Sequence, residues 1–331
     1  MPPPATLLML ILFSPTLLAD TGYPTNPQQV SSAIVMSHQG ISAYDPLTLK
    51  MRWSSLANLH TDEPTQAPGM LLVGSSDGLF SLSSITGGVR WRFGPGRRLF
   101  SPTISGDLAY TTGIDGTLYT LSLGSGHLIR QQKISEGWIY PPAIIGGLLI
   151  TGGEDGTVRA IEAATGVLRW LRPLGQELVY RPVAGPSGSV IITTFEGRVF
   201  VIDGLNGEVR LQRQDPVASF SPVVDEERIY LTGYDNQLRV LDGISGELLW
   251  TKTLPGRPVV SPQIHSKCLL VTSGEGNYLL LNKHSGATLD QGRSSTSSLG
   301  ALVLNDQRMV FFQSHGKIPT TRPVFSCNNP T

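Results

Sequence analysis

The sequence repeats with a period of about 40 residues, and this period constrains the fold more than any other feature. A glycine or asparagine that follows a polar or acidic residue recurs every 38 to 41 residues. The members are Gly40, Gly78, Gly116, Gly156, Gly197, Asn236, Gly276 and Gly316. A proline lies about fourteen residues before most of these turns, and a second glycine follows about ten residues after them. Three series with one period indicate an array of equal structural units.

Each unit is predicted to form four short strands. In the sixth copy, a short strand at 222–224 precedes strands at 228–232 and 237–242, and a fourth strand lies near 247–250. Asp235-Asn236 between the second and third strands is typical of a tight hairpin, because asparagine tolerates a positive φ. Four strands in about 40 residues are the pattern of a propeller blade. The sequence therefore predicts an all-β chain, a β-propeller of four-stranded antiparallel blades.

The number of repeats sets the number of blades. Seven copies are complete between Pro27 and Asp290, and an eighth is partial. A closed ring leaves no blade incomplete, so we expect eight blades, the last completed by an N-terminal strand near residues 21–26. The alternative is seven blades. Residues 20–331 are then a single domain, with 315–331 as its closing segment or as a tail.

The first nineteen residues are interpreted as a secretory signal peptide. The apolar run at 7–18 has twelve residues, whereas a membrane-spanning helix needs about 20. The segment before it carries no Lys or Arg, which departs from the usual signal, and no cysteine follows the expected cleavage point at Ala19. We expect an exported protein, periplasmic or secreted, with no transmembrane segment and no attached lipid.

Composition excludes several classes of function. The 25 Lys and Arg balance the 25 Asp and Glu, so the basic surface of a nucleic-acid-binding protein is not expected. None of the six histidines has the spacing of a zinc ligand, and no nucleophile or phosphate-binding motif occurs. The acidic hairpin residues recur once per blade, so they are expected to serve turns rather than one metal ion.

The runs 162–170 and 242–250 resemble the pyrroloquinoline-quinone-like (PQQ-like) propeller repeat, whose pattern is Ala-x-Asp-x-x-Thr-Gly-x-x-x-Trp. The resemblance covers nearly the whole chain after residue 19. It implies that the tryptophan of each repeat docks between neighbouring blades. The residues in that position are Trp53, Trp91, Trp170 and Trp250. Docking is expected to be weaker in the copies that lack the tryptophan.

The resembled family has two functional branches. One contains quinoprotein dehydrogenases, which are much longer and hold PQQ and calcium within inserted loops. The other is non-catalytic, and its BamB-like members act in assembly of the outer membrane. The even period of this chain leaves no room for such loops. We therefore expect a non-catalytic scaffold or assembly factor without a cofactor. A PQQ-dependent oxidoreductase with calcium, or a degenerate relative of one, is the alternative.

Loops between the outer strand of one blade and the inner strand of the next open near the centre of a propeller. Aromatic and arginine side chains in them are candidates for contacts with a protein or peptide partner of a monomeric ring. These candidates are Arg97, Arg98, Trp138, Glu177, Tyr180, Arg181 and Arg257. Phe100, Tyr140, Tyr180 and Phe220 recur two residues before each proline, which also fits a packing role.

The chain has two cysteines, Cys268 and Cys327. In an exported protein they are able to form a disulfide that ties the C-terminal segment to the ring. The alternative is an inert buried Cys268.

Overall fold

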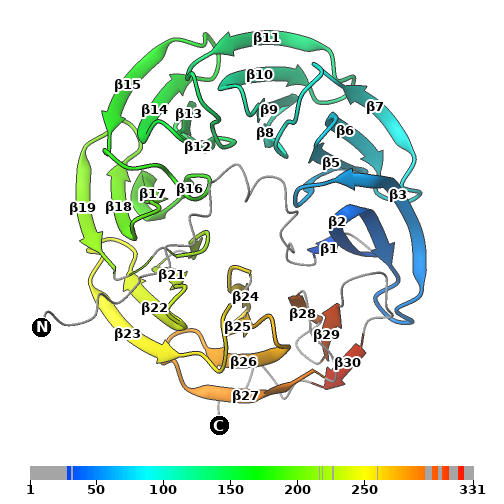
Figure 1. Ribbon diagram of the computed structural model, residues 1–331, viewed down its shortest axis with the longest axis vertical. Helices are drawn as coiled ribbons and strands as arrows, with labels where there is room; N and C mark the ends of the chain where they lie inside the picture. The colour runs from blue at the N-terminus through cyan, green and yellow to red at the C-terminus, as the bar shows by residue number, and fades with distance from the viewer. Residues whose placement is uncertain are drawn as a thin grey trace, which may run out of the picture.

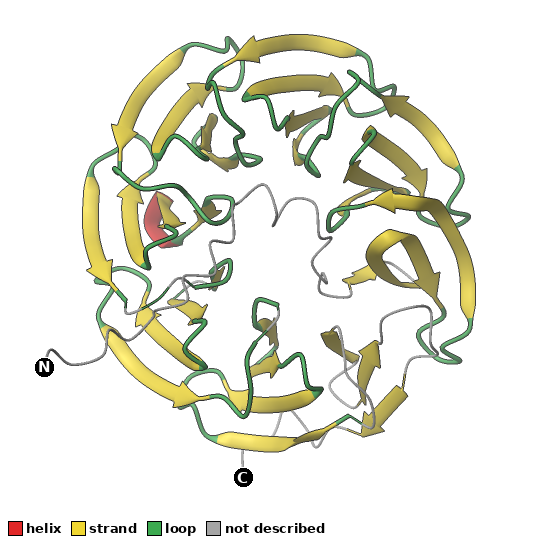
Figure 2. Cartoon of the chain, in the orientation of Figure 1, coloured by secondary structure: helices red, strands yellow, loops and turns green. Residues whose placement is uncertain are grey.

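The computed structural model describes residues 28–30, 33–215, 217, 219–225, 227–258, 260–294, 300–304, 308–312 and 320–323. Its strands form a ring of radially arranged sheets (Figure 1). One short 3-10 turn at Pro186–Gly188 is the single helical element of the described chain (Figure 2). The predicted all-β class is thus confirmed.

The described strands form eight sheets around the ring, six of four strands and two of three. The first three-stranded sheet contains β1 (Gln28–Val30), β2 (Ala33–Tyr44) and β3 (Met51–His60). The next two sheets contain β4 (Thr65–Ala67), β5 (Met70–Ser75), β6 (Gly78–Ser83) and β7 (Val89–Phe93), then β8 (Thr103–Ser105), β9 (Leu108–Thr112), β10 (Thr117–Ser122) and β11 (Leu128–Lys133). They are followed by β12 (Ala143–Ile145), β13 (Leu148–Thr151), β14 (Thr157–Glu162) and β15 (Leu168–Pro173).

The second half of the ring continues the pattern. It contains β16 (Val183–Ala184), β17 (Ser189–Thr193), β18 (Arg198–Asp203) and β19 (Val209–Gln214), then β20 (Val223–Val224), β21 (Arg228–Thr232), β22 (Gln237–Asp242) and β23 (Leu248–Thr253). The last sheets contain β24 (Gln263–His265), β25 (Cys268–Thr272), β26 (Asn277–Asn282) and β27 (Thr288–Arg293), and β28 (Gly300–Leu304), β29 (Arg308–Phe312) and β30 (Thr320–Pro323). Each sheet is an antiparallel meander, with its first strand innermost and its last strand outermost in the complete blades (Figure 1).

The first copy departs from the predicted blade. Strand β2 runs through the expected hairpin at Gln39-Gly40 without a break: its start pairs with β1 and its end with β3. Gly40 has φ +94°, and its Cα faces the carbonyl oxygens of Ser55 and Leu56 so closely that a Cβ would lie 2.9 Å from each. The N-terminal strand expected near residues 21–26 lies outside the described residues, as do residues 1–27 as a whole.

The predicted turns adopt the expected backbone. Asn236 has φ +60°, and the glycines in the same position of the neighbouring copies also have positive φ. Asparagine takes this conformation more readily than other residues with a Cβ, which explains its use in place of glycine. The sequence signal for the hairpins therefore reflects a backbone requirement.

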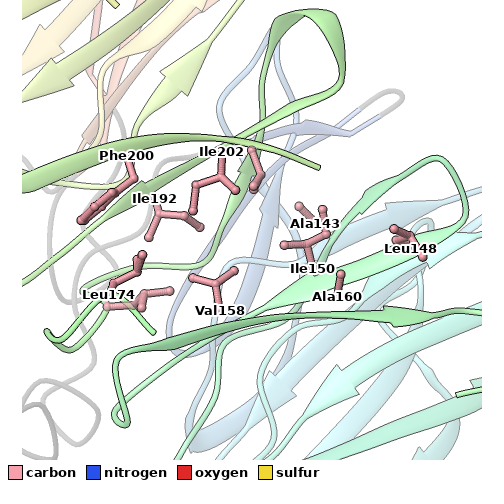
Figure 3. Packing of buried hydrophobic residues seen from close by; sticks show 11 residues of the cluster. Ala143, Leu148, Ile150, Val158, Ala160, Leu174, Ile192, Phe200 and Ile202 are labelled. Carbon is pink, nitrogen blue, oxygen red and sulfur yellow. The ribbon is translucent and has the colours of Figure 1, made fainter. Parts of the chain in front are cut away.

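The core lies between adjacent sheets. One cluster joins β12–β15 to β16–β19, where Ile150 and Val158 face Ile192 and Phe200 (Figure 3). All four side chains are at most 3% exposed. Strands two and three of each blade thus alternate between the interfaces with the preceding and following blades, which is why they are apolar on both faces.

The inner strands are tied to one another by threonines. The Thr65 hydroxyl donates to the Pro102 carbonyl oxygen at 2.6 Å, and Thr103 donates to the Pro142 carbonyl oxygen at 2.6 Å. Each threonine lies on an inner strand, and each acceptor directly precedes the next inner strand. These bonds fix the spacing of the residues that face the centre of the ring.

Candidate binding face at the centre of the ring

Tryptophans of the outer strands contact the following blade. The Trp91 ring on β7 lies against Gly126, whose Cα would place a Cβ 2.5 Å from the ring. The Trp91 indole nitrogen donates to the Leu123 carbonyl oxygen at 3.1 Å. Trp170 and Trp250 make the same bonds to Gly204 and His284 at 3.1 and 3.0 Å. Trp53 also packs on the next turn glycine, Gly87.

The third and fifth copies use other side chains at this position. Arg130 approaches Gly166 and donates from its guanidinium to the Ala163 carbonyl oxygen at 3.1 Å and to that of Ala164. Leu211 packs on Gly246 without a donor. In the third copy arginine thus supplies a hydrogen bond to the following blade, as the indole does elsewhere. The expectation of weaker docking in these copies stays a prediction.

The four phased aromatic residues and Tyr234 form what we call the aromatic belt: Phe100, Tyr140, Tyr180, Phe220 and Tyr234. Phe100 and Tyr140 have ring centroids 5.7 Å apart, and those of Tyr180 and Phe220 are 6.2 Å apart. The Tyr140 hydroxyl donates to the Val179 carbonyl oxygen, next to Tyr180. The ring centroids of Phe220 and Tyr234 are 4.7 Å apart. The belt thus spans four consecutive blades, because Phe220 and Tyr234 belong to the same one.

Arginines lie at both ends of the aromatic belt. The Arg98 guanidinium is 5.5 Å from the Phe100 ring centroid, and the Arg257 guanidinium is 5.0 Å from that of Tyr234. Each guanidinium is thus within the range of a cation–π contact with its ring. Arg257 is exposed, whereas Arg98 is largely buried. The arginine at one end of the belt is therefore open to solvent, and the arginine at the other end is not.

Arg97 and Arg98 are neutralised by carboxylates. Arg98 donates to Asp62 at 2.9 Å, and Arg97 pairs with Asp115. Burial raises the pKa of Asp62, and the positive charge of Arg98 opposes that shift. These two arginines are therefore held within the ring by their ion pairs.

Trp138 belongs to the packing under the aromatic belt. It is 8% exposed, and its ring meets that of Tyr140 edge to face, with the ring centroids 4.8 Å apart.

Burial raises the pKa of Tyr140 far above the ordinary value, with smaller contributions from Tyr234 and from the carboxylates of Asp62 and Glu177. Glu177 is half-buried, and both its burial and the neighbouring Glu154 raise its pKa. Tyr140 is therefore neutral at physiological pH.

A cavity of about 360 Å³ lies at the inner strands β8, β12 and β16. The residues that line it are Thr103, Ile104, Ser105, Pro142, Ala143, Ile144, Arg181, Pro182, Val183 and Ala184. Arg181 is exposed, and the salt bridges of the described chain give it no carboxylate partner. Of the sequence candidates, Arg181 alone lines this cavity.

The lining does not fit a quinone with calcium. Calcium is bound by carboxylate and carbonyl oxygens in sets of six to eight. None of the described residues that line the cavity has a carboxylate side chain. In the part of the chain that the structure describes, no three His, Cys, Asp or Glu residues are grouped as metal ligands, and no helix is long and apolar enough to cross a membrane.

Cys268 is fully buried on β25 and takes part in a disulfide. The other cysteine, Cys327, lies outside the described residues. The pairing of the two stays a prediction.

Two residues of the site, Asp62 and Tyr234, are not among the candidates predicted from the sequence. Tyr234 precedes the hairpin acid Asp235, at a position where other copies have Ser76, Ile114 or Glu154. An aromatic residue at this variable position is a sequence signal from which Tyr234 could have been predicted as part of the site. Asp62 lies two residues before Pro64, at the repeat position that Phe100 and Tyr140 take before their own prolines. A carboxylate in place of the aromatic ring was therefore a signal, and its contact with Arg98 shows its role.

Comparison with known proteins agrees with the repeat and the ring. A family model described as outer membrane protein assembly factor BamB matches residues 78–216 and 154–318. The chain belongs to this BamB-type family of PQQ-like propellers. A curated BamB from Xanthomonas campestris pv. campestris is 31% identical over 106 residues. That match spans 31% of this chain and only 25% of the Xanthomonas protein.

Three solved structures are similar to this chain in fold. BamB from Moraxella catarrhalis has a TM-score of 0.69 at 17% identity, covering 92% of this chain and 97% of its own. Sqt1 from Saccharomyces cerevisiae has a TM-score of 0.76 at 12% identity, covering 93% and 97%. The designed protein Ika8 has a TM-score of 0.72 at 13% identity, covering 88% and 93%. At these identities the structures establish the propeller fold alone.

Proposed function

We propose that this chain is an exported, non-catalytic propeller scaffold whose protein partner binds at the aromatic belt. The observation that carries the proposal is the belt itself, with exposed Arg257 over the Tyr234 ring. Tyrosine and arginine are enriched among residues that dominate binding energy. The BamB-type family supports a partner from outer-membrane protein assembly and a periplasmic location. The proposed scaffold needs no cofactor and acts as a monomeric ring.

Arg257 offers a surface variant that leaves the core intact. Its side chain is exposed, so Arg257→Glu reverses a charge without opening a cavity. Arg90 on the outermost strand β7 is also exposed and lies away from the belt. Arg90→Glu is therefore a matched control with the same change of charge.

The test is affinity capture with crosslinking from the envelope of the native host, with residues 20–331 as bait. We expect the wild-type ring and the Arg90→Glu control to recover components of outer-membrane β-barrel assembly. Arg257→Glu should lower that recovery at least about fivefold, because reversing one charge at a contact costs of the order of 1 kcal/mol or more. Equal recovery with all three proteins would refute the assignment of the face.

A further inference from the structure

The cavity at β8, β12 and β16 has the features of a site for an extended chain. Each of these strands is the innermost strand of its sheet and pairs with one neighbour only, on its outward side. The opposite edge of each strand has no strand partner among the described residues. Edge strands of this kind bind added strands through their free N–H and C=O groups.

The side chains of the cavity set the chemistry of the occupant. Ile104, Ile144 and Val183 are half-buried and line the cavity from three successive blades. An apolar lining of β-branched residues suits aliphatic side chains that alternate along a strand. The Thr103 hydroxyl is not a free donor for an occupant of the cavity, since it already donates to the Pro142 carbonyl oxygen.

Arg181 supplies the charge. It is exposed at the cavity and lacks the carboxylate that Arg97 and Arg98 each have within the ring. Among the residues that the structure describes, no other charged side chain lines the cavity. A guanidinium in this position has its planar set of donors available to a carboxylate from outside.

We propose that this cavity binds an extended peptide segment with one acidic side chain, which pairs with Arg181 between flanking aliphatic residues. The inference rests on the proposed scaffold function and specifies the part of the partner that enters the ring. Backbone bonds to the inner edge of one of these sheets would hold the strand. The carboxylate would set its register, because Arg181 is the one cation among the described residues that line the cavity.

The probe is the peptide Gly-Ser-Thr-Val-Glu-Val-Thr-Ser-Gly, labelled with fluorescein at its amino end and amidated at its carboxyl end. A matched peptide carries Gln in place of Glu. Fluorescence anisotropy measures the binding of both peptides to the ring of residues 20–331. We expect the acidic peptide to bind at least about tenfold more tightly than the Gln peptide.

Two variants locate the site. Arg181→Gln should remove the preference for the acidic peptide, while Arg90→Gln should leave it unchanged. Ala184→Phe places a bulky side chain at an exposed lining position and should weaken both peptides, since it fills the cavity without altering the core. Circular dichroism and thermal unfolding check that each variant keeps its fold.

The outcomes separate this inference from the scaffold proposal. Equal affinity for the two peptides, or an acidic preference that survives Arg181→Gln, overturns the inference. If Arg257→Glu still abolishes partner capture, the scaffold proposal stands by itself. Conversely, the preference for the acidic peptide can depend on Arg181 while Arg257→Glu leaves partner capture unchanged. That result would support the peptide site and refute the aromatic belt as the docking face.

Discussion

The Trp91 indole nitrogen donates a hydrogen bond to the Leu123 carbonyl oxygen at 3.1 Å, which joins the outer strand of one blade to a turn of the next. The two residues are 32 positions apart, somewhat less than one repeat. The same relationship recurs for Trp170 with Gly204 and for Trp250 with His284. It is therefore the repeated unit of contact between blades.

Trp91→Phe is expected to lower the free energy of unfolding by about 1 kcal/mol, because it removes the indole donor and keeps most of the ring. Urea unfolding followed by circular dichroism measures the change. Neighbouring Arg90→Ala, on the exposed side of β7, should stay within about 0.5 kcal/mol of the wild type. A loss for Arg90→Ala as large as that for Trp91→Phe would contradict the role of the indole.

Gly87→Ala should destabilise the ring more than Gly96→Ala. Both glycines have positive φ, +70° and +78°, so both variants bear the same backbone strain of about 1 kcal/mol. At Gly87 the new Cβ would also lie 2.4 Å from the Trp53 ring, while at Gly96 it meets nothing within 4 Å. The difference in thermal unfolding between the two variants reports the clash with Trp53. Equal midpoints would show that the tryptophan moves aside freely.

Asp235 should make the stability of the sixth blade depend on pH. The hydrogen bond from Arg239 is the largest cause that lowers the pKa of Asp235 below its ordinary value. A carboxyl group whose pKa is lower in the folded state stabilises it above the unfolded pKa of about 3.9, and this contribution is lost as the pH falls through the folded value. Asp235→Asn should therefore be less stable than the wild type at pH 6, by about 1 kcal/mol.

Urea unfolding of both proteins at pH 6, 5, 4 and 3 tests this prediction. The gap between wild type and Asp235→Asn should stay constant from pH 6 to 5 and shrink below about pH 4. A gap that grows as the pH falls would mean that the carboxylate is not stabilised by Arg239.

Cys268 and Cys327 are predicted to form a disulfide. Cys268 is fully buried and disulfide-bonded, and the chain has two cysteines in all. Digestion without reductant followed by mass spectrometry should yield one crosslinked peptide that contains both. Intermolecular dimers on a non-reducing gel, in place of that peptide, would show that the bond joins two chains. Loss of an internal bond should cost about 2–4 kcal/mol.

Much of the fold could be predicted because it depends on short-range rules. Hairpins at Gly78 or Asn236 need a positive φ, and that requirement acts on the residue itself. The first copy was predicted less well. Gly40 retains the turn residue, yet β2 continues through it, because its end pairs with the long strand β3. Pairing between strands overrode the local turn signal there.

The candidate site was predictable in part. Arg181 was singled out by its place before an inner strand, and it does line the central cavity. Trp138 was singled out by the same argument but is buried against Tyr140. Position in the repeat identifies the loop. It does not say which side chain of that loop turns inward, since that depends on packing with the next blade.

The sequence by itself determined the period, the four strands of each unit and the residues at their turns, because backbone conformation and alternation act over a few residues. The tertiary structure alone decided which side chains of different copies meet. Asp62 pairs with Arg98 across 36 positions, and Arg257 covers the Tyr234 ring of the preceding blade. These contacts depend on the twist of each sheet and the curvature of the ring, which place neighbouring loops within reach of one another.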